Sequence, residues 1–241
     1  MRVIVVAVLA IAAQAQQQPA APAEFEVVSV KPGEGASRGS SWGMPPGRLM
    51  MRNFTLKAIV MSAYSLNEYQ VVGGPAWMDS AKFNIDAKLP AGAPQSQIPP
   101  ATQAMLADRF KLESHRETRT LREYALVVAK GGPKVGKPSE GEHSFETSQN
   151  DNQITGWGRP LSDLARMLIG VVQAPVVDRT GLKGKYDFDL KFAPLSAAPE
   201  ADQGLPTIFS ALQEKLGLKL EAIKGPVEVL VIDHAEMPSA N

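Results

Sequence analysis

The sequence predicts an α+β protein of two similar β-α-β-β-α-β-β halves, each a small, mostly antiparallel sheet packed by two helices. Stretches with helical apolar spacing alternate with stretches that alternate like strands, and their order occurs twice. Matched intervals of seven and fifteen residues separate corresponding apolar positions, which are Leu49, Leu56 and Val71 in the first half and Ile154, Leu161 and Val176 in the second. A chance match of spacings within a single α+β domain is the alternative.

The first half begins with a strand at 25–30, ahead of the repeated elements. A helix with the apolar stripe Leu56, Ile59 and Val60 is expected to start near Thr55, because threonine is a good N-cap residue. A second helix is expected around 105–106. The strands expected around these helices lie at 49–51, 71–72, 82–86, 110–112 and 124–128.

The second half repeats this order, with helices at 161–168 and 212–216. Its strands are expected near 154 and at 176–177, 185–189, 216–218 and 227–232. The stretch 131–143 is rich in Gly, Pro, Lys and Glu, which is typical of a linker. The predicted halves are therefore 24–130 and 144–238.

The N-terminus has the features of a secretory signal peptide, predicted over residues 1–15. Arg2 is followed by an apolar run at 3–13 and by the small-x-small site Ala13-Gln14-Ala15. A buried strand or a membrane anchor is the alternative, but the run is too short to span a bilayer. We expect an exported protein, periplasmic or secreted, with no membrane span once the signal is removed.

Composition narrows the class of partner. Lys plus Arg and Asp plus Glu each number 25, so the net charge is zero and nucleic acid is not an expected partner. The chain has no cysteine, so disulfides cannot stabilise it outside the cell. No cofactor is predicted, because no ligand or metal motif is present.

Several motifs together resemble a known family. They are FEVVSVKP at 25–32, GGPAW at 73–77, LADRFKL at 106–112 with HRET at 115–118, VDRTGL at 177–182 and KGPVEVLVIDH at 224–234. They are similar to the soil-associated exported protein family, a domain of unknown function expanded in Acidobacteria. Members can be fused to sensor metalloproteases related to beta-lactam antirepressors, which implies extracytoplasmic sensing or partner binding. Each half more weakly resembles the short N-terminal domain of secretins and TonB-dependent receptors, a module that docks proteins.

Candidate chemistry is sparse, and no catalytic or metal-binding residue is predicted. Ser41 lies in a G-x-S-x-G match, but the sequence around it predicts a loop rather than a nucleophile elbow. His143 lies among acidic residues in the predicted linker, without metal-ligand spacing. A catalytic site would gain support if His115, Asp178 or His234 lay within hydrogen-bonding distance of one another.

A polar binding patch is the more plausible kind of site. The charged stretch at 115–123 contains His115 and Arg116, which we expect to form an exposed cross-strand ladder of charges or to dock an acidic partner. Arg109 and Trp77 complete the predicted binding residues. The alternative for Trp77 is a structural role, in which its side chain fills the core between helix and sheet.

The sequence therefore favours a non-enzymatic exported module that binds an envelope or secreted protein. An open sheet edge is one way in which such a module could bind its partner. A hydrolase acting on an envelope or extracellular polymer is the first alternative. A small-molecule carrier with an apolar cavity between the halves is the second.

Overall fold

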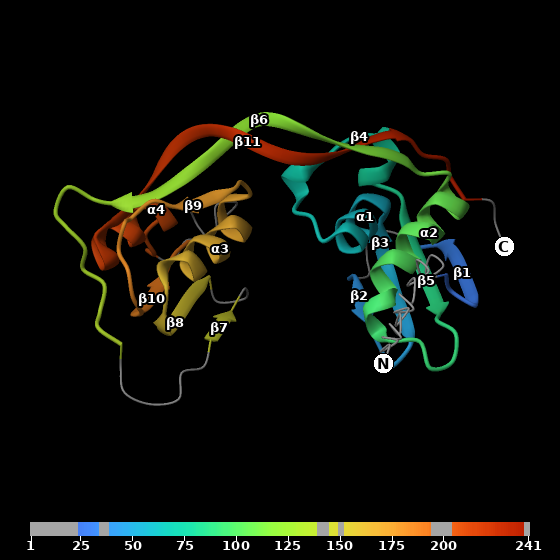
Figure 1. Cartoon of the computed structure of the whole chain (residues 1–241), viewed down its shortest axis with the longest axis horizontal. Coiled ribbons are helices and arrows are strands. Elements are labelled where there is room, and N and C mark those ends of the chain that lie inside the picture. Colours follow the sequence, from blue (N-terminus) through green and yellow to red (C-terminus); the bar gives the residue numbers. More distant parts are fainter. Residues whose placement is uncertain (1–23, 34–38, 139–144, 149–151, 194–203, 239–241) are drawn as a thin grey trace, which may run out of the picture.

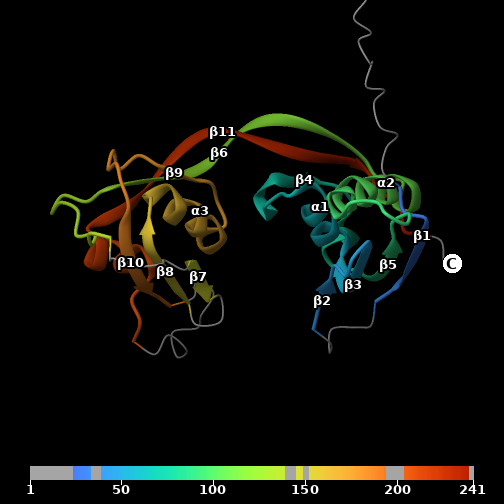
Figure 2. The same cartoon turned by 60° about the horizontal axis from the view of Figure 1, so that its bottom comes forward.

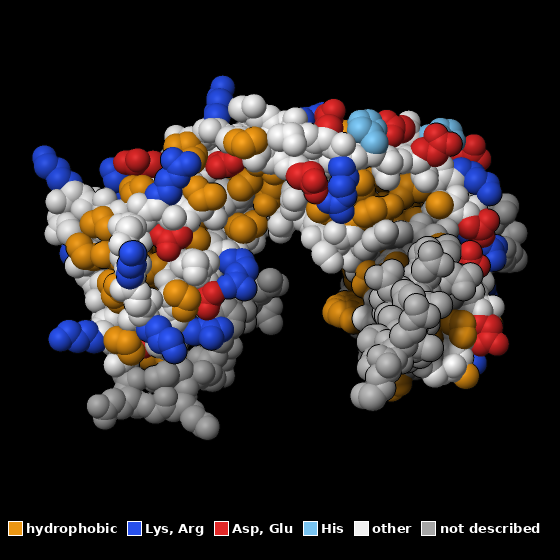
Figure 3. Space-filling model, in the orientation of Figure 1, with side chains coloured by type: hydrophobic (Ala, Val, Ile, Leu, Met, Phe, Trp, Pro, Cys, Tyr) orange, Lys and Arg blue, Asp and Glu red, His pale blue; other side chains and the backbone are white. Residues whose placement is uncertain are grey.

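The computed structural model describes residues 24–33, 39–138, 145–148, 152–193 and 204–238. These residues form two lobes joined by a long two-stranded ribbon, in the outline of an arch (Figure 1). A space-filling view shows an open space between the lobes, beneath the ribbon (Figure 3). Each lobe has its own cluster of buried apolar side chains. The predicted α+β fold class is confirmed.

Lobe 1 is built on a four-stranded antiparallel sheet. Its strands are ordered β1 (Val27–Pro32), β5 (Lys82–Lys88), β3 (Arg48–Thr55) and β2 (Ser41–Gly43). Helices α1 (Leu56–Tyr64) and α2 (Ile98–Phe110) cover one face (Figures 1 and 2). Because successive strand residues point to opposite faces, alternate side chains enter the core, among them Val30, Leu49, Met51, Phe83 and Ile85.

Lobe 2 has a three-stranded antiparallel sheet. Its strands are ordered β10 (Tyr186–Lys191), β8 (Gln153–Arg159) and β7 (Phe145–Ser148). Helix α3 (Leu161–Val172) packs against it, together with α4 (Ile208–Ala211) and the π-helical turn η4 (Leu212–Leu216). Both lobes thus combine an antiparallel sheet with helices on its core side.

The ribbon consists of β6 (Glu113–Val128) and β11 (Leu218–His234), which pair antiparallel along their whole length. A short strand pairs in parallel orientation with the outer side of each long strand. β4 (Val71–Gly73) lies beside β11 in lobe 1, and β9 (Val176–Asp178) lies beside β6 in lobe 2. Each long strand starts in the lobe of its own half and ends in the other. Leu230 and Ile232 of β11 therefore belong to the core of lobe 1, and Leu126 of β6 to that of lobe 2.

The sequence analysis expected two strands at the end of each half. Each half instead ends in one continuous strand, β6 in the first and β11 in the second. The stretch from Glu113 to Glu123 contains no Gly, Pro, Asn or Asp to turn the chain. In β11, Gly225-Pro226 resembles a turn signal, but Pro226 lies opposite Thr120 within the ladder. Proline is tolerated there because this stretch pairs with β6 alone and its other side is open.

The start of α1 is as predicted, since Thr55 is its N-cap and Thr55 Oγ1 accepts a hydrogen bond of 3.3 Å from the Ala58 amide. We expect Thr55→Ala to lower the free energy of unfolding by about 1 kcal/mol, because that amide loses its partner. Urea unfolding measures the change. Thr55→Ser keeps the hydroxyl and is the control; an equal loss in both variants would contradict the capping role.

Candidate binding surfaces

The four predicted binding residues all lie in or beside lobe 1, in different surroundings. Trp77, in the short 3₁₀ helix η2 (Ala76–Asp79), packs against the core with its ring edge-on to Phe83 at 6.3 Å. This contact favours the structural interpretation of Trp77. Arg109 lies in the last turn of α2, with its Nε 3.1 Å from the Asp108 carboxylate. His115 and Arg116 lie near the start of β6.

The charged stretch of β6 forms ion pairs with its neighbours. His115 Nδ1 lies 2.8 Å from Asp233 Oδ2, and Arg116 pairs with Glu228 across the ribbon. Glu117 pairs with Arg119. Figure 3 shows pale blue His side chains beside red acidic ones along the ribbon. His115, Arg116 and Arg119 already have carboxylate partners, so this stretch offers less attraction to an acidic partner than its sequence suggests.

The hydrogen bond to Asp233 raises the pKa of His115 above its usual value, with Glu117 adding to the effect. Because the folded-state pKa is the higher one, the stabilisation is complete below the unfolded-state pKa and is lost as the pH rises through the folded-state value. We expect an NMR titration to show a raised midpoint for His115 and Asp233→Asn to lower it. An unchanged midpoint in that variant would remove Asp233 as the cause.

The groups that could have supported catalysis do not come together. Asp178, in lobe 2, accepts a hydrogen bond from the Thr180 amide at 2.9 Å and so stabilises the chain where it leaves β9. His234 pairs instead with Glu236 at 3.0 Å. Ser41 lies in β2 rather than in the expected loop, and the chain continues into β3 rather than a helix.

His143 falls outside the described residues. Within the described ranges, no three His, Asp or Glu side chains are grouped to hold a metal ion. In the same part of the chain, none of the helices has the length and apolar character needed to cross a bilayer.

A groove runs between β1 and α2 and has a volume of about 370 Å³. Its lining combines apolar side chains with a charged rim and comprises Glu24, Phe25, Glu26, Val28, Ala101, Ala104, Met105, Asp108 and Arg109. Met105 and Ala101 are buried at its base. Of the predicted residues, Arg109 is the one that lines this groove.

The groove lies beside a sheet edge, because β1 is the last strand of its sheet. Both cartoon views place β1 on the side of lobe 1 that faces away from lobe 2 (Figures 1 and 2). The Gly33 amide donates to the Lys82 carbonyl at 2.6 Å, and the same register continues along β1. Hydrogen-bonded pairs alternate in an antiparallel ladder, so the amides of Val28 and Val30 point to the open side.

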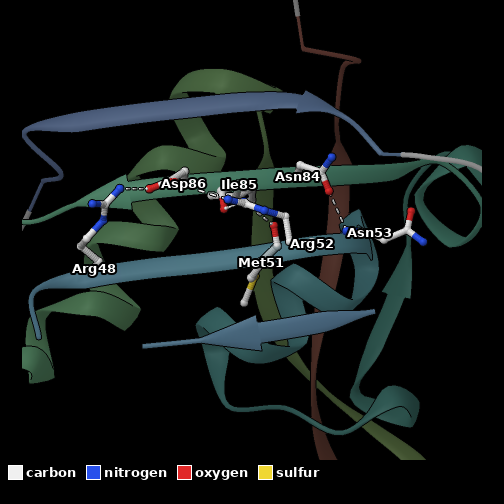
Figure 4. Close-up of polar contacts among 7 residues, drawn as sticks. All are labelled: Arg48, Met51, Arg52, Asn53, Asn84, Ile85 and Asp86. Carbon is white, nitrogen blue, oxygen red and sulfur yellow. Dashed lines mark hydrogen bonds and ion pairs between the residues drawn. The ribbon is translucent and has the colours of Figure 1, made fainter. Parts of the chain in front are cut away.

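The outer face of the lobe 1 sheet is polar and mostly basic. The Arg48 guanidinium lies 2.7 Å from the Asp86 carboxylate, and the Arg52 guanidinium lies 3.4 Å from it (Figure 4). This face contains a shallow hollow of about 400 Å³. It is lined by Val27, Ser29, Lys31, Arg48, Arg52, Asn84 and Asp86. Hydrogen bonding by Arg48, followed by its charge and the contribution of Arg52, lowers the pKa of Asp86, so this carboxylate stays ionised.

A β-bulge fixes the position of Arg52. The β3 register shifts between Met51 and Phe54, and Asn53 adopts a left-handed conformation with φ of 63°. Arg52 donates to the Ile85 carbonyl at 2.9 Å, and Asn84 Oδ1 accepts from the Asn53 amide at 2.9 Å (Figure 4). These contacts satisfy backbone groups that the irregular ladder would leave unpaired.

The sequence interpretation did not select the residues of this face. Arg48 and Arg52 alternate with Leu49 and Met51, which is the pattern of a strand with one buried face. That signal could have found them. Their meeting with Lys31 and Asp86 depends on the strand order β1-β5-β3, which the sequence does not reveal.

The fold and surfaces define a two-lobed α+β protein whose lobes exchange their last strands. The chain belongs to the family described as "Protein of unknown function (DUF3738)", whose model matches residues 57–235. Searches of curated proteins and of solved structures found no match.

Proposed function

We propose that this protein is an exported, non-enzymatic binding module that takes an extended segment of an envelope or secreted protein as an additional strand on the open edge of β1. The groove between that edge and α2 is the observation that carries the proposal. Added strands gain affinity from main-chain hydrogen bonds and specificity from pockets for alternate side chains. The signal-like residues 1–15 and the resemblance to an exported, soil-associated family support the location.

Among the strands at the ends of the described sheets, β1 is the best suited to strand addition. The ribbon strands β6 and β11 also have open stretches between the lobes, but the groove that carries the proposal lies beside β1. The edge strands β2, β4 and β9 have three residues each, and the edge strand β7 has four. β10 has six, but its edge is bridged by Gly136, whose carbonyl accepts a hydrogen bond from the Asp187 amide. β1 also has six residues, with a half-buried Val28 beside the groove.

The groove supplies the second requirement, a place for side chains. An added strand would lie along β1 with every other side chain turned toward α2, where Phe25, Val28 and Met105 offer apolar contact. The hydrolase and carrier alternatives are not favoured by a specific contact among the described residues.

A displayed library of linear peptides about eight residues long, matched to typical strand length, tests the proposal. Peptides enriched on the protein from Gln16 onward are expected to slow hydrogen exchange at the amides of Val28 and Val30. The amides of Ser29 and Lys31 already face β5 and serve as internal controls. Failure to enrich any peptide, or protection confined to another surface, would overturn the proposal.

A pair of variants on α2 tests the groove itself. Ala104 lines it, whereas Ala107 is exposed on the same helix and does not. Ala104→Trp is expected to fill the groove and weaken binding of an enriched peptide at least about tenfold, roughly the loss of one well-buried contact. Ala107→Trp is expected to leave affinity unchanged. Equal effects of both variants would show that the peptide binds elsewhere.

A further inference from the structure

The outer face of lobe 1 has no role in strand addition as proposed so far, yet it borders the same strand. The odd-numbered residues Val27, Ser29 and Lys31 turn toward this face, whereas Val28 and Val30 turn toward the helices. A strand added to β1 continues the pleat of the sheet. Alternate partner side chains would therefore stand beside Lys31 on one face and beside α2 on the other.

Charge differs between the two faces. The outer hollow is lined by three cations, Lys31, Arg48 and Arg52, against one carboxylate, Asp86. Both arginines share Asp86, while Lys31 has no ion-pair partner among the described residues. Lys31 also belongs to the strand that would neighbour the partner directly. The hollow is therefore set up to attract negative charge.

The same side of the sheet carries further cations behind this hollow. Lys82 and Lys88 alternate with the buried Phe83 and Ala87 in β5, so they share the outer face with Asp86. Lys88 lies 3.7 Å from the Glu26 carboxylate at the start of β1. The whole face thus presents five cations against Asp86 and, at one corner, Glu26.

The groove on the α2 side has a different character. Its base is formed by buried or half-buried apolar side chains, and three carboxylates, Glu24, Glu26 and Asp108, stand near the rim beside Arg109. Apolar partner side chains fit the base because they remove its surface from water. An acidic side chain placed there would meet like charge.

We infer that the partner segment alternates acidic and apolar residues, its carboxylates beside Lys31 on the outer face and its apolar side chains in the α2 groove; this inference rests on the proposed function. Opposite charges that face each other across neighbouring strands attract, and like charges repel. The outer face therefore sets which side of the partner strand turns toward the helix. Charge discriminates among segments that fit the groove equally well.

Synthetic peptides that differ only at outward positions test the inference. Each is about eight residues long, with valine at alternate positions and glutamate, glutamine or lysine between them. The glutamate peptide is expected to bind up to about fivefold tighter per cross-strand pair than the glutamine peptide, and the lysine peptide more weakly. The advantage is expected to shrink as salt concentration rises.

Two charge-reversal variants locate the effect. Lys31→Glu is expected to abolish the preference for glutamate, while the glutamine peptide still protects the amides of Val28 and Val30. Lys191→Glu makes the same charge change on the exposed end of β10 in lobe 2 and is expected to keep the preference.

The outcomes separate the two proposals. Equal affinity for the glutamate and glutamine peptides, with Val28 and Val30 protected, overturns the inference and leaves strand addition standing. A glutamate preference that survives Lys31→Glu also overturns it. If none of the peptides protects these amides, both proposals fail.

Discussion

Leu230→Ala is expected to destabilise lobe 1 by about 3 kcal/mol, although Leu230 lies in the second half of the sequence. Its side chain is 2% exposed and is part of the lobe 1 core. Truncating a buried leucine removes apolar contact and leaves a cavity, which costs roughly 2–5 kcal/mol. The loss should appear in lobe 1 first because β11 delivers Leu230 there.

Tryptophan fluorescence can assign this loss to a lobe. Trp77 packs against the lobe 1 core and Trp157 lies on β8 of lobe 2. In a Trp157→Phe background, emission during urea unfolding reports on lobe 1. Val231→Ala is the matched control, because its side chain is only half-buried beside Leu230 and should cost much less. If Leu230→Ala cost no more than Val231→Ala, the crossing of β11 into lobe 1 would be contradicted.

Gly217→Ala is expected to destabilise lobe 2 by about 3 kcal/mol. Gly217 ends η4 with φ of 62°, a conformation that costs a residue with a side chain roughly 1–2 kcal/mol. An added Cβ would also clash with the Gly132 carbonyl oxygen, and such overpacking adds about 1–3 kcal/mol. Hydrogen bonds from the Ala129 and Lys134 amides to Gly217 and Leu216, both 2.8 Å, fix this backbone contact.

The same substitution elsewhere in lobe 2 is the control. Gly170 lies in α3, where an added Cβ meets nothing within 4 Å. Gly170→Ala is expected to raise stability by up to about 1 kcal/mol, through its better helix propensity. In a background with Trp42→Phe and Trp77→Phe, which removes the lobe 1 tryptophans, Trp157 emission follows both variants. Similar stability of the two would mean that the segment at 129–134 does not pack against η4.

The sequence was most informative where local chemistry decides the structure. The apolar stripe Leu56, Ile59 and Val60 and the cap Thr55 predicted α1, because helical spacing and capping depend on neighbours within a turn. Apart from the short strands β2 and β7, the predicted order of helices and strands also holds up to the second helix of each half. The internal repeat of the two halves, and the division at 131–143, stay predictions.

Long-range pairing could not be predicted in the same way. The sequence predicted a strand at 124–128 in the first half. It contained nothing to show that this strand lies in lobe 2 and pairs there with β9, where Tyr124 is opposite Val176. The charge of 115–123 was evident, whereas the carboxylates that pair with His115 and Arg116 come from β11. The basic outer face was missed for the same reason, since Lys31 and Arg48 meet only after β5 is inserted between their strands.

Because β6 and β11 are exchanged, cutting the chain within 131–143, between the two halves of the sequence, would not separate the lobes. One fragment would carry Leu126 into lobe 2, and the other would carry Leu230 and Ile232 into lobe 1. Neither fragment could fill its own core without the other, and the β6–β11 ladder would still join them. A nicked molecule is therefore expected to behave as a tight heterodimer of complementary fragments rather than to separate into two independent domains.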